Sequence, residues 1–166
     1  MARLALVKNV AAFLDLIATS EGTSNSKVTH DDGYDIIVSG INGPNIFTDY
    51  SAHPFAAGRA PIIVCTHPKL LESTASGRYQ IILPTWKHIA HIRNLTVFSP
   101  QNQDLAAETL LEECHAVDLI TAGKIASAIE TVSETWASFP GNSYGQGGKS
   151  LTWLLDTYAT LLAAQQ

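Results

Sequence analysis

The sequence predicts an α+β fold in which a mostly helical part is joined to a small antiparallel β-hairpin part. Apolar side chains recur at helical spacing near the beginning of the chain and again from residue 99 onward. Between these regions, two short β-prone runs flank a turn-forming segment, which indicates a hairpin. No internal repeat or linker-like stretch is present, so we expect one domain over residues 1–166.

The first helix is predicted over residues 4–19 and is expected to end near Gly22. Its apolar side chains follow the spacing of a helix packed on a core, and they are Leu6, Val10, Phe13, Leu14 and Ile17. Strands are expected over residues 34–38 and 46–48, because the segment 42–45 (Asn-Gly-Pro-Asn) has strong turn chemistry. These elements form the predicted hairpin.

The middle of the chain predicts a long excursion over residues 51–68, interpreted as a mobile hairpin around the apolar run 62–64. A loop of small residues follows, and a helix is expected from about Pro84 to Arg93, because proline suits a first helical turn. Ser99 and Pro100 supply an N-cap and a first-turn proline for the later helices. After a glycine-rich break over residues 139–148, a last helix is expected over about 149–163.

Composition excludes several classes of protein. The net charge of −5 and the lack of a basic stretch argue against nucleic-acid binding and against a cationic membrane face. No apolar stretch approaches the roughly 18 residues of a membrane span, and no signal peptide is recognisable, so we expect synthesis and folding in a cytoplasm. Cys65 and Cys114 have no metal-binding spacing and are expected to be separate thiols, with a later disulfide as the alternative. His88 and His91 lack a third ligand nearby, so no metal or other cofactor is predicted.

Glu21 differs from most of the fifteen Asp and Glu residues, which fall on helix faces or in polar loops. It directly follows the first predicted helix and precedes Gly22. The dipole of a helix C-terminus and apolar neighbours both raise the pKa of a carboxyl group. A glutamic acid that is still protonated near neutral pH can donate a proton to a glycosidic oxygen. Glu21 is therefore the candidate acid, and a solvated glutamate at a helix end is the alternative.

A second carboxyl group about 5 to 9.5 Å away would point to an ordinary glycosidase. The candidates are Asp35, on the first expected strand, and Asp49, after the second. The alternative for Asp49 is a turn cap, and the alternative for Asp35 is a contact that only stabilises the hairpin. We expect Asp35 to be the better candidate for contact with a substrate.

Aromatic and amide side chains in turn-rich segments are candidates for binding sugars, by stacking and by hydrogen bonds. They are Tyr34, Tyr79, Gln80, Tyr144 and Gln146. Trp136 lies at helical spacing from Ile129 and Val132, so it is predicted to be a core residue instead.

Short motifs in order along nearly the whole chain are similar to those of the lambda-type phage endolysins. They include Ser20-Glu21-Gly22-Thr23, Gly33-Tyr34-Asp35-Ile36-Ile37-Val38, Phe47-Thr48-Asp49-Tyr50-Ser51, Gly77-Arg78-Tyr79-Gln80, Phe98-Ser99-Pro100, Trp136-Ala137-Ser138 and Tyr144-Gly145-Gln146. The resemblance implies a lysozyme-like α+β fold with a cleft between a helical lobe and a small hairpin lobe. It places Tyr144 and Gln146 on a lower lip of that cleft, residues 54–68 on an upper lip, and Tyr79 and Gln80 on its floor.

The resemblance also implies a lytic transglycosylase that cuts the β-1,4 bond between N-acetylmuramic acid and N-acetylglucosamine in peptidoglycan. Glu21 occupies the position of the family's catalytic glutamate, and a 1,6-anhydro sugar is the expected product. The alternatives are a hydrolytic muramidase assisted by Asp35 or Asp49, and a non-catalytic wall-binding phage protein. We expect a monomer that is made in the host cytoplasm, reaches the wall with the help of a holin, and binds glycan strands without inserting in a membrane.

Three features depart from the family pattern. The hairpin turn around residues 42–45 and the segment 55–66 are several residues longer, and the C-terminal tail is shorter. The acidic balance also differs, because the resemblance implies a more basic protein suited to an anionic wall. Glycan binding by the lips could therefore differ from that of the family.

Overall fold

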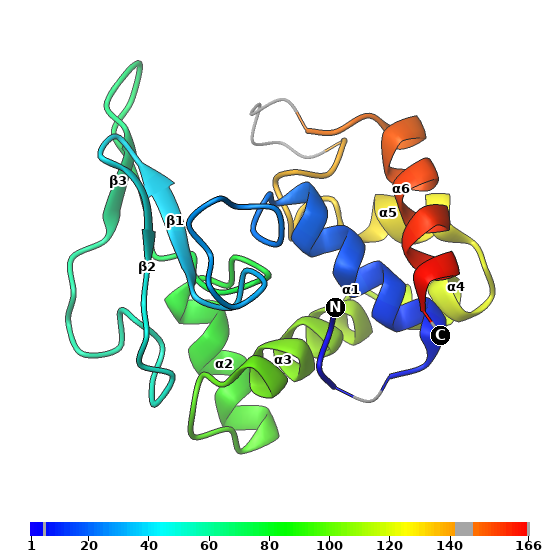
Figure 1. Ribbon diagram of the computed structural model, residues 1–166, viewed down its shortest axis with the longest axis horizontal. Coiled ribbons are helices and arrows are strands. Elements are labelled where there is room, and N and C mark those ends of the chain that lie inside the picture. The colour runs from blue at the N-terminus through cyan, green and yellow to red at the C-terminus, as the bar shows by residue number, and fades with distance from the viewer. Residues whose placement is uncertain (5, 142–147, 166) are drawn as a thin grey trace. The chain divides into compact units, whose positions relative to one another are not determined.

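The computed structural model describes residues 1–4, 6–141 and 148–165, and its contacts divide the chain into two compact units (Figure 1). The first unit comprises residues 1–22 and 107–166, and the second comprises residues 23–106. The division falls within helix α3 (Pro100–Glu113), between Ala106 and Ala107. No helix in the described chain is both long and apolar enough to cross a membrane.

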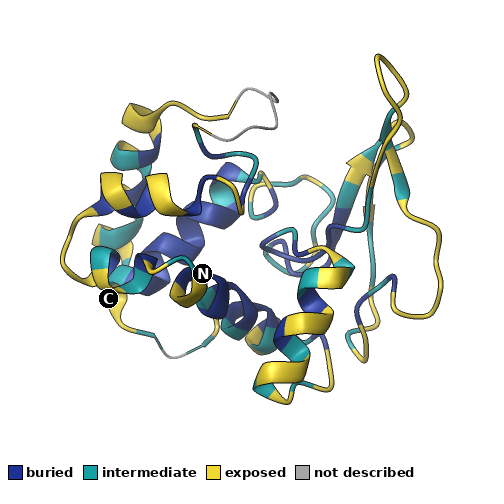
Figure 2. Ribbon diagram, turned by 180° about the vertical axis from the view of Figure 1, so that it is seen from behind, coloured by how far each residue is buried: buried dark blue, intermediate teal, exposed yellow. Residues whose placement is uncertain are grey.

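The first unit is helical. It contains the last part of α3 together with α1 (Lys8–Ser20), α4 (Ala116–Thr121), α5 (Ile125–Val132) and α6 (Leu151–Ala164). Helix α1 is buried over residues 10–18, as expected for a helix that is apolar around its circumference (Figure 2). Helices α4 and α6 pack on it. The ring of Phe13 lies edge-on to Phe139 and Tyr158, with centroids 6.1 and 6.2 Å apart.

Asp15 is a buried charge within α1, with only 2% of its surface exposed. One carboxylate oxygen accepts a hydrogen bond from the backbone N–H of Ala2 (2.9 Å), and the other accepts one from Nε2 of Gln165 (2.8 Å). These bonds satisfy a carboxyl group that would otherwise be costly to bury. Asp15 thereby fastens the segments at both ends of the described chain to the central helix.

The second unit carries the β-structure. Strands β1 (Ile36–Gly40) and β2 (Gly43–Ile46) form one antiparallel pair, and β3 (Ile62–Cys65) and β4 (Leu71–Ser73) form another. The two hairpins are linked by a backbone hydrogen bond from Ile41 N–H to Ile63 O (3.0 Å). Helix α2 (Leu83–Arg93) and the first part of α3 complete this unit (Figure 1).

The predicted α+β class is confirmed, and the main helices lie close to their predicted bounds. Ser99 caps α3 as expected, because its hydroxyl accepts from the N–H of Asn102 (3.3 Å). The strand bounds were less accurate: β1 begins at Ile36 rather than at Tyr34, and β2 includes Pro44 and Asn45, which were expected in the turn. The excursion contains only the first strand of the hairpin β3–β4, because β4 begins at Leu71, after the predicted end at residue 68. In the described chain the β-structure therefore consists of two hairpins.

The core of the second unit is organised around the buried side chain of Gln103 in α3. Its Oε1 accepts from the backbone N–H of Arg78 (3.0 Å), and its Nε2 donates to the carbonyls of Tyr34 (3.1 Å) and Phe98 (3.0 Å). Gly77 makes this arrangement possible: it has φ = +76°, and a Cβ at this position would lie 2.1 Å from Gln103 Oε1. One amide group therefore joins three separate segments.

We predict that Gly77→Ala lowers the free energy of unfolding by about 3 kcal/mol, because backbone strain adds to the displacement of Gln103 and its hydrogen bonds. Gly58→Ala is the matched control, since Gly58 also has positive φ (+86°) but a Cβ at this position would meet nothing within 4 Å. The control should cost only about 1 kcal/mol. Urea unfolding of both variants measures the difference, and equal losses would show that the contact with Gln103 is unimportant.

Candidate active site

Glu21 lies immediately after α1, where it forms the C-cap of the helix with φ = −70° and ψ = −14°. Its backbone N–H still donates to Ile17 O (2.9 Å), so the helix fixes the direction in which the side chain leaves the backbone. The side chain is half-buried, and its Oε1 accepts a hydrogen bond from the hydroxyl of Ser138 at 2.7 Å. The candidate acid thus has one defined polar partner within the helical unit.

The helical core holds Ser138 in place. The backbone N–H of Lys149 donates to Ser138 O (2.8 Å), and the neighbouring Phe139 packs its ring against Phe13 of α1. Gly148 permits the close approach of the two chain segments, because a Cβ there would lie 2.7 Å from Phe139 O. The sequence motif at 136–138 contained Ser138, but no pattern in the sequence linked it to Glu21, 117 positions earlier.

The surroundings of Glu21 favour its neutral form. Burial raises the pKa of the carboxyl group, and hydrogen bonds from Ser138 oppose this effect without cancelling it, so the pKa lies above the ordinary value of a glutamate. A carboxyl group in this state keeps its proton to higher pH than an exposed glutamate does. Glu21 can therefore act as a proton donor and, once ionised, as a base supported by the Ser138 hydroxyl.

Tyr34 and Tyr79 lie in the core of the β-containing unit, and both donate their hydroxyls to Oδ1 of Asp104, at 2.7 and 2.6 Å. Burial and the negative charge on Asp104 raise the pKa of both phenols. The guanidinium of Arg78 lies over the ring of Tyr34, 5.2 Å from its centroid, and forms an ion pair with Asp32 (2.8 Å).

This arrangement corrects the expectation that sugar rings stack on Tyr34 and Tyr79. Neither side chain has any exposed surface, so both act as buried framework. Asp104 and Gln103 were not among the residues predicted from the sequence, because polar residues in the first turns of a helix ordinarily indicate a solvated face. Asp104 and Gln103 are buried because they bind Tyr34, Arg78 and Tyr79, which lie far away in the sequence.

Asp35 and Asp49 also have structural partners. Asp35 is buried, and its two oxygens accept from the hydroxyl of Thr29 (2.5 Å) and from the backbone N–H of His30 (2.8 Å). This closes the loop before β1 and corrects the expectation that Asp35 faces a substrate. Asp49 is exposed and accepts from the N–H of Ser51 (2.8 Å). Hydrogen bonds from the side chain of Ser51 and from this N–H lower the pKa of the Asp49 carboxyl group. It is the turn cap that was the alternative for this residue.

Gln80 is the one expected sugar-binding residue in the described chain that retains partial exposure. It adopts a positive φ of 50°, and its Nε2 donates to Gly77 O (3.0 Å). Tyr144 and Gln146 lie outside the described residues. Trp136 is buried in the helical unit, as predicted. Both cysteine thiols are free, and no group of three potential metal ligands occurs in the described parts of the chain.

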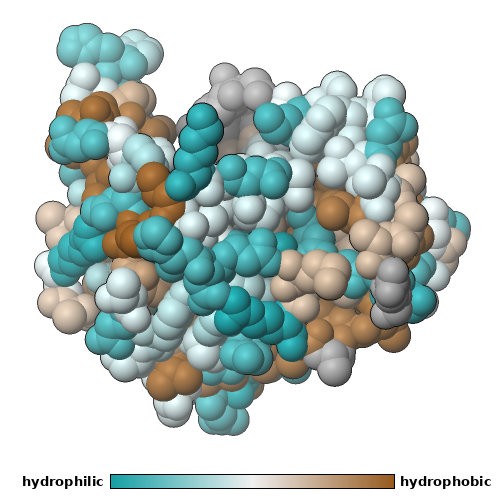
Figure 3. Space-filling model, viewed as in Figure 1, coloured by the Kyte–Doolittle hydropathy of each residue, from teal (hydrophilic) through white to brown (hydrophobic). Residues whose placement is uncertain are grey.

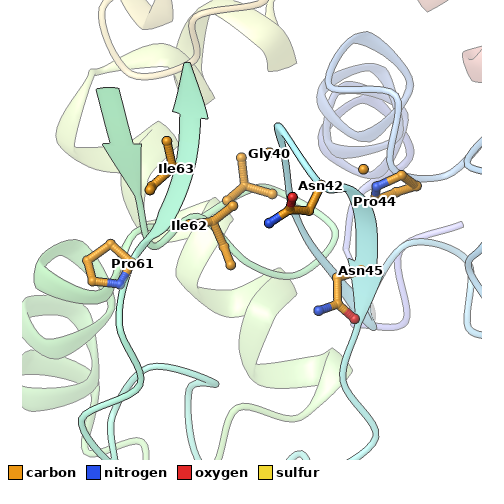
Figure 4. Close-up of a pocket in the computed structure, with 9 residues that line it drawn as sticks. Gly40, Asn42, Pro44, Asn45, Pro61, Ile62 and Ile63 are labelled. Carbon is orange, nitrogen blue, oxygen red and sulfur yellow. The ribbon is translucent and has the colours of Figure 1, made fainter. Parts of the chain in front are cut away.

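A pocket of about 280 Å³ lies beside the two hairpins of the β-containing unit (Figure 4). Apolar and amide side chains mix around it, and its lining comprises Val38, Gly40, Asn42, Gly43, Pro44, Asn45, Pro61, Ile62 and Ile63. Glu21 and the expected sugar-binding residues that the structure describes do not line this pocket, whereas Pro61, Ile62 and Ile63 belong to the segment 54–68 that was expected to form the upper lip. Exposed apolar side chains continue on the β3–β4 hairpin with Ile63, Leu70 and Leu71, where the space-filling view shows hydrophobic atoms below a hydrophilic tip (Figure 3).

The helical unit contains a buried helix that is followed directly by a protonatable glutamate, and the other unit contains small β-hairpins. This is the architecture of a lysozyme-like protein. Comparison with solved structures confirms this class. Bacteriophage lambda lysozyme complexed with a chitohexasaccharide matches with a TM-score of 0.82 and 37% identity, over 95% of this chain and 96% of that chain. A second structure of lysozyme from bacteriophage lambda matches with a TM-score of 0.72 and 35% identity, over 96% and 93% of the two chains.

Sequence comparison identifies the family. The endolysin family model matches residues 11–164. The endolysin of Escherichia phage P2 is 47% identical over 154 residues, which cover 92% of each chain. The endolysin of Escherichia phage lambda is 43% identical over 136 residues, covering 81% of this chain and 79% of that one. The chain therefore belongs to the endolysin family of peptidoglycan-degrading enzymes, as its motifs predicted.

We predict that Glu21→Gln stabilises the protein at neutral pH. The pKa of Glu21 is raised on folding. The contribution of its neutral side chain to the free energy of unfolding is therefore complete below the ordinary glutamate pKa of about 4.3. This contribution is lost as the pH rises through the pKa of the folded state. Glutamine cannot ionise and avoids this loss. The melting temperature of the variant should exceed that of the wild type at pH 7, and the difference should shrink toward pH 4.

Circular dichroism at the two pH values measures this effect. Glu72→Gln is the matched control, because Glu72 is exposed on β4 and a surface charge contributes little to folding. A wild type that is as stable as Glu21→Gln at pH 7 would contradict the unfavourable burial of the charged form.

Proposed function

We propose that this endolysin is a lytic transglycosylase that cleaves the β-1,4 bond between N-acetylmuramic acid and N-acetylglucosamine, with Glu21 as its only catalytic carboxyl group. The observation that carries this proposal is the raised pKa of Glu21, in a setting that provides a hydroxyl donor for its ionised form. Both candidates for a second carboxyl group, Asp35 and Asp49, are already engaged in loop and turn contacts. A mechanism with one carboxyl group is therefore the better fit.

In the first half of the reaction, the neutral carboxyl group of Glu21 donates its proton to the glycosidic oxygen as the bond to C1 of the muramic acid breaks. Positive charge develops on that sugar, and the N-acetylglucosamine leaves with a free hydroxyl group. Proton donation of this kind contributes about 10²- to 10⁴-fold to a rate. Because burial raises the pKa of Glu21, the donor stays available to higher pH than an exposed glutamate would.

In the second half, the ionised Glu21 removes the proton from the C6 hydroxyl of the muramic acid, and the resulting oxygen attacks C1 of the same sugar. The product is a 1,6-anhydro ring, the carboxyl group is protonated again, and no water is consumed. Since the nucleophile belongs to the substrate, no second carboxylate is needed to activate water. The Ser138 hydroxyl supports Glu21 during the interval in which it is charged.

The proposed substrate is a peptidoglycan glycan strand. Lambda lysozyme has been solved with a chitohexasaccharide, an oligomer of N-acetylated sugars, which supports a glycan of this kind as ligand. We assign contacts with the strand to Gln80, whose side chain is partly exposed, and to Tyr144 and Gln146. The enzyme is proposed to act as a monomer on the host wall after its release from the cytoplasm.

The proposal predicts that Glu21→Gln loses at least about 10²-fold in the rate of muropeptide release while the protein remains folded. Asp49→Asn should stay within about twofold of the wild type, because Asp49 only caps an exposed turn. Release of soluble muropeptides from purified peptidoglycan provides the rate, and circular dichroism confirms folding. Glu72→Gln serves as the matched surface control.

Different results would point to different enzymes. A muramidase that uses Asp49 would lose activity in Asp49→Asn as strongly as in Glu21→Gln. Asp35→Asn tests the other candidate, and its folding must be checked because the side chain closes a loop. Normal activity of Glu21→Gln would remove Glu21 from the mechanism and refute the proposal.

A further inference from the structure

Beyond Glu21, a line of oxygen atoms continues into the helical unit. The Oε1 atom of Glu21 lies 2.7 Å from Oγ of Ser138, which lies 2.8 Å from Oγ of Ser20, which in turn lies 2.9 Å from the carbonyl oxygen of Ile17. Ser20 is 6% exposed, so its hydroxyl has little access to solvent. Four oxygens are thus connected by three contacts, each at ordinary hydrogen-bond length.

The number of protons in this line depends on the state of Glu21. Each serine hydroxyl can donate one hydrogen bond and accept others, whereas the Ile17 carbonyl can only accept. When Glu21 is ionised, Ser138 donates to it and Ser20 donates to Ser138, so two protons fill two contacts. When Glu21 is neutral, it can donate to Ser138, Ser138 to Ser20, and Ser20 to Ile17. Three protons then fill all three contacts.

We propose that Ser138 and Ser20 form a reversible hydroxyl relay that positions the Glu21 carboxyl group and provides it with a hydrogen-bond partner in both of its protonation states. The relay consists of these two hydroxyls and the Ile17 carbonyl. Its direction reverses when the two O–H bonds rotate, and no heavy atom has to move. No proton leaves the relay, because the proton that Glu21 exchanges goes to and from the substrate.

The relay deepens the proposed function and rests on it, since only a residue that serves as acid and then as base needs support in both states. A fixed donor would favour the ionised state alone, and a fixed acceptor would favour the neutral state alone. Two rotatable hydroxyls in series adapt to either state. Ser138 and Ser20 are therefore positioning residues that act through Glu21.

The hydrogen bonds of the relay involve Glu21, the hydroxyls of Ser138 and Ser20, and the Ile17 carbonyl. Asp15 on α1 is engaged by Ala2 and Gln165. The other charged side chains in the described part of the helical unit are Arg3, Lys8, Glu108, Glu112, Glu113, Asp118, Lys124, Glu130, Glu134, Lys149 and Asp156. The Lys149 ammonium lies over the ring of Trp153, 5.4 Å from its centroid. The loop that follows Glu21 in the sequence carries the further charged or titratable residues Lys27, His30, Asp31, Asp32 and Asp35.

The relay predicts opposite effects for the two serines. Ser138→Ala removes the charge-assisted hydrogen bond to the carboxylate, so the midpoint of the Glu21 titration should rise. Ser20→Ala removes one contact from the ionised arrangement but two from the neutral one, so the midpoint should fall. We expect each shift to be about half a pH unit or more.

The test is an NMR titration of the folded protein labelled with ¹³C at the glutamate side-chain carboxyl carbons, with the Glu21 signal assigned by its absence in Glu21→Gln. The matched control is Ser133→Ala, because Ser133 is also buried and also donates to a carbonyl three residues earlier, that of Glu130 (2.9 Å). This control should leave the midpoint unchanged. Ser138→Thr, which keeps the hydroxyl, should restore the wild-type value.

Shifts of Ser138→Ala and Ser20→Ala in the same direction would overturn the relay. A purely structural role predicts that both midpoints fall, because a loosened site admits water and water favours the charged carboxylate. An unchanged midpoint in Ser20→Ala would likewise overturn it. The titration needs no peptidoglycan, so the relay can fail while Glu21→Gln still abolishes muropeptide release, and the two proposals are tested separately.

Discussion

The proposed chemistry of this endolysin depends on the opposition between burial of the Glu21 carboxyl group and the hydrogen bonds that Ser138 donates to it. Burial disfavours the charged form and raises the pKa, while Ser138 limits the rise by stabilising the carboxylate. If Glu21 were buried without a hydrogen-bond donor, its neutral form could donate a proton, but its ionised form would be very unfavourable. If Glu21 had the donor but were exposed, it would be ionised at neutral pH like an ordinary glutamate. A single residue can serve in both halves of a transglycosylase cycle only if both effects act on it.

The β-containing unit is organised by polar contacts of a different kind. Asp104 accepts the hydroxyls of Tyr34 and Tyr79, and Gln103 joins the backbone of three segments. Buried polar groups that are fully paired specify one arrangement strongly, because each unpaired alternative is costly. The motif at residues 77–80 is therefore framework over most of its length, and it presents Gln80 at a partly exposed position.

Local signals were sufficient to predict the helices from the sequence. The apolar spacing along α1, the proline at residue 84 and the Ser99 cap each act within a few residues, so the corresponding bounds were close. The β-strand bounds and the roles of Tyr34, Tyr79 and Asp35 were harder to predict. They depend on Asp104, Thr29 and the hairpin register, and aromatic residues in turns look the same whether they face solvent or a buried carboxylate. Ser138 was missed for the same reason, since its partner lies 117 positions away.

The claim that one carboxyl group performs the whole reaction is tested most directly by digesting purified peptidoglycan in ¹⁸O-labelled water and analysing the released muropeptides by mass spectrometry. If Glu21 acts alone, we expect products with 1,6-anhydromuramic ends that are lighter than the hydrolysis products by one water and carry no ¹⁸O. Products with reducing ends that contain one ¹⁸O atom would contradict the claim, because they would show that water is the nucleophile and that another group must activate it.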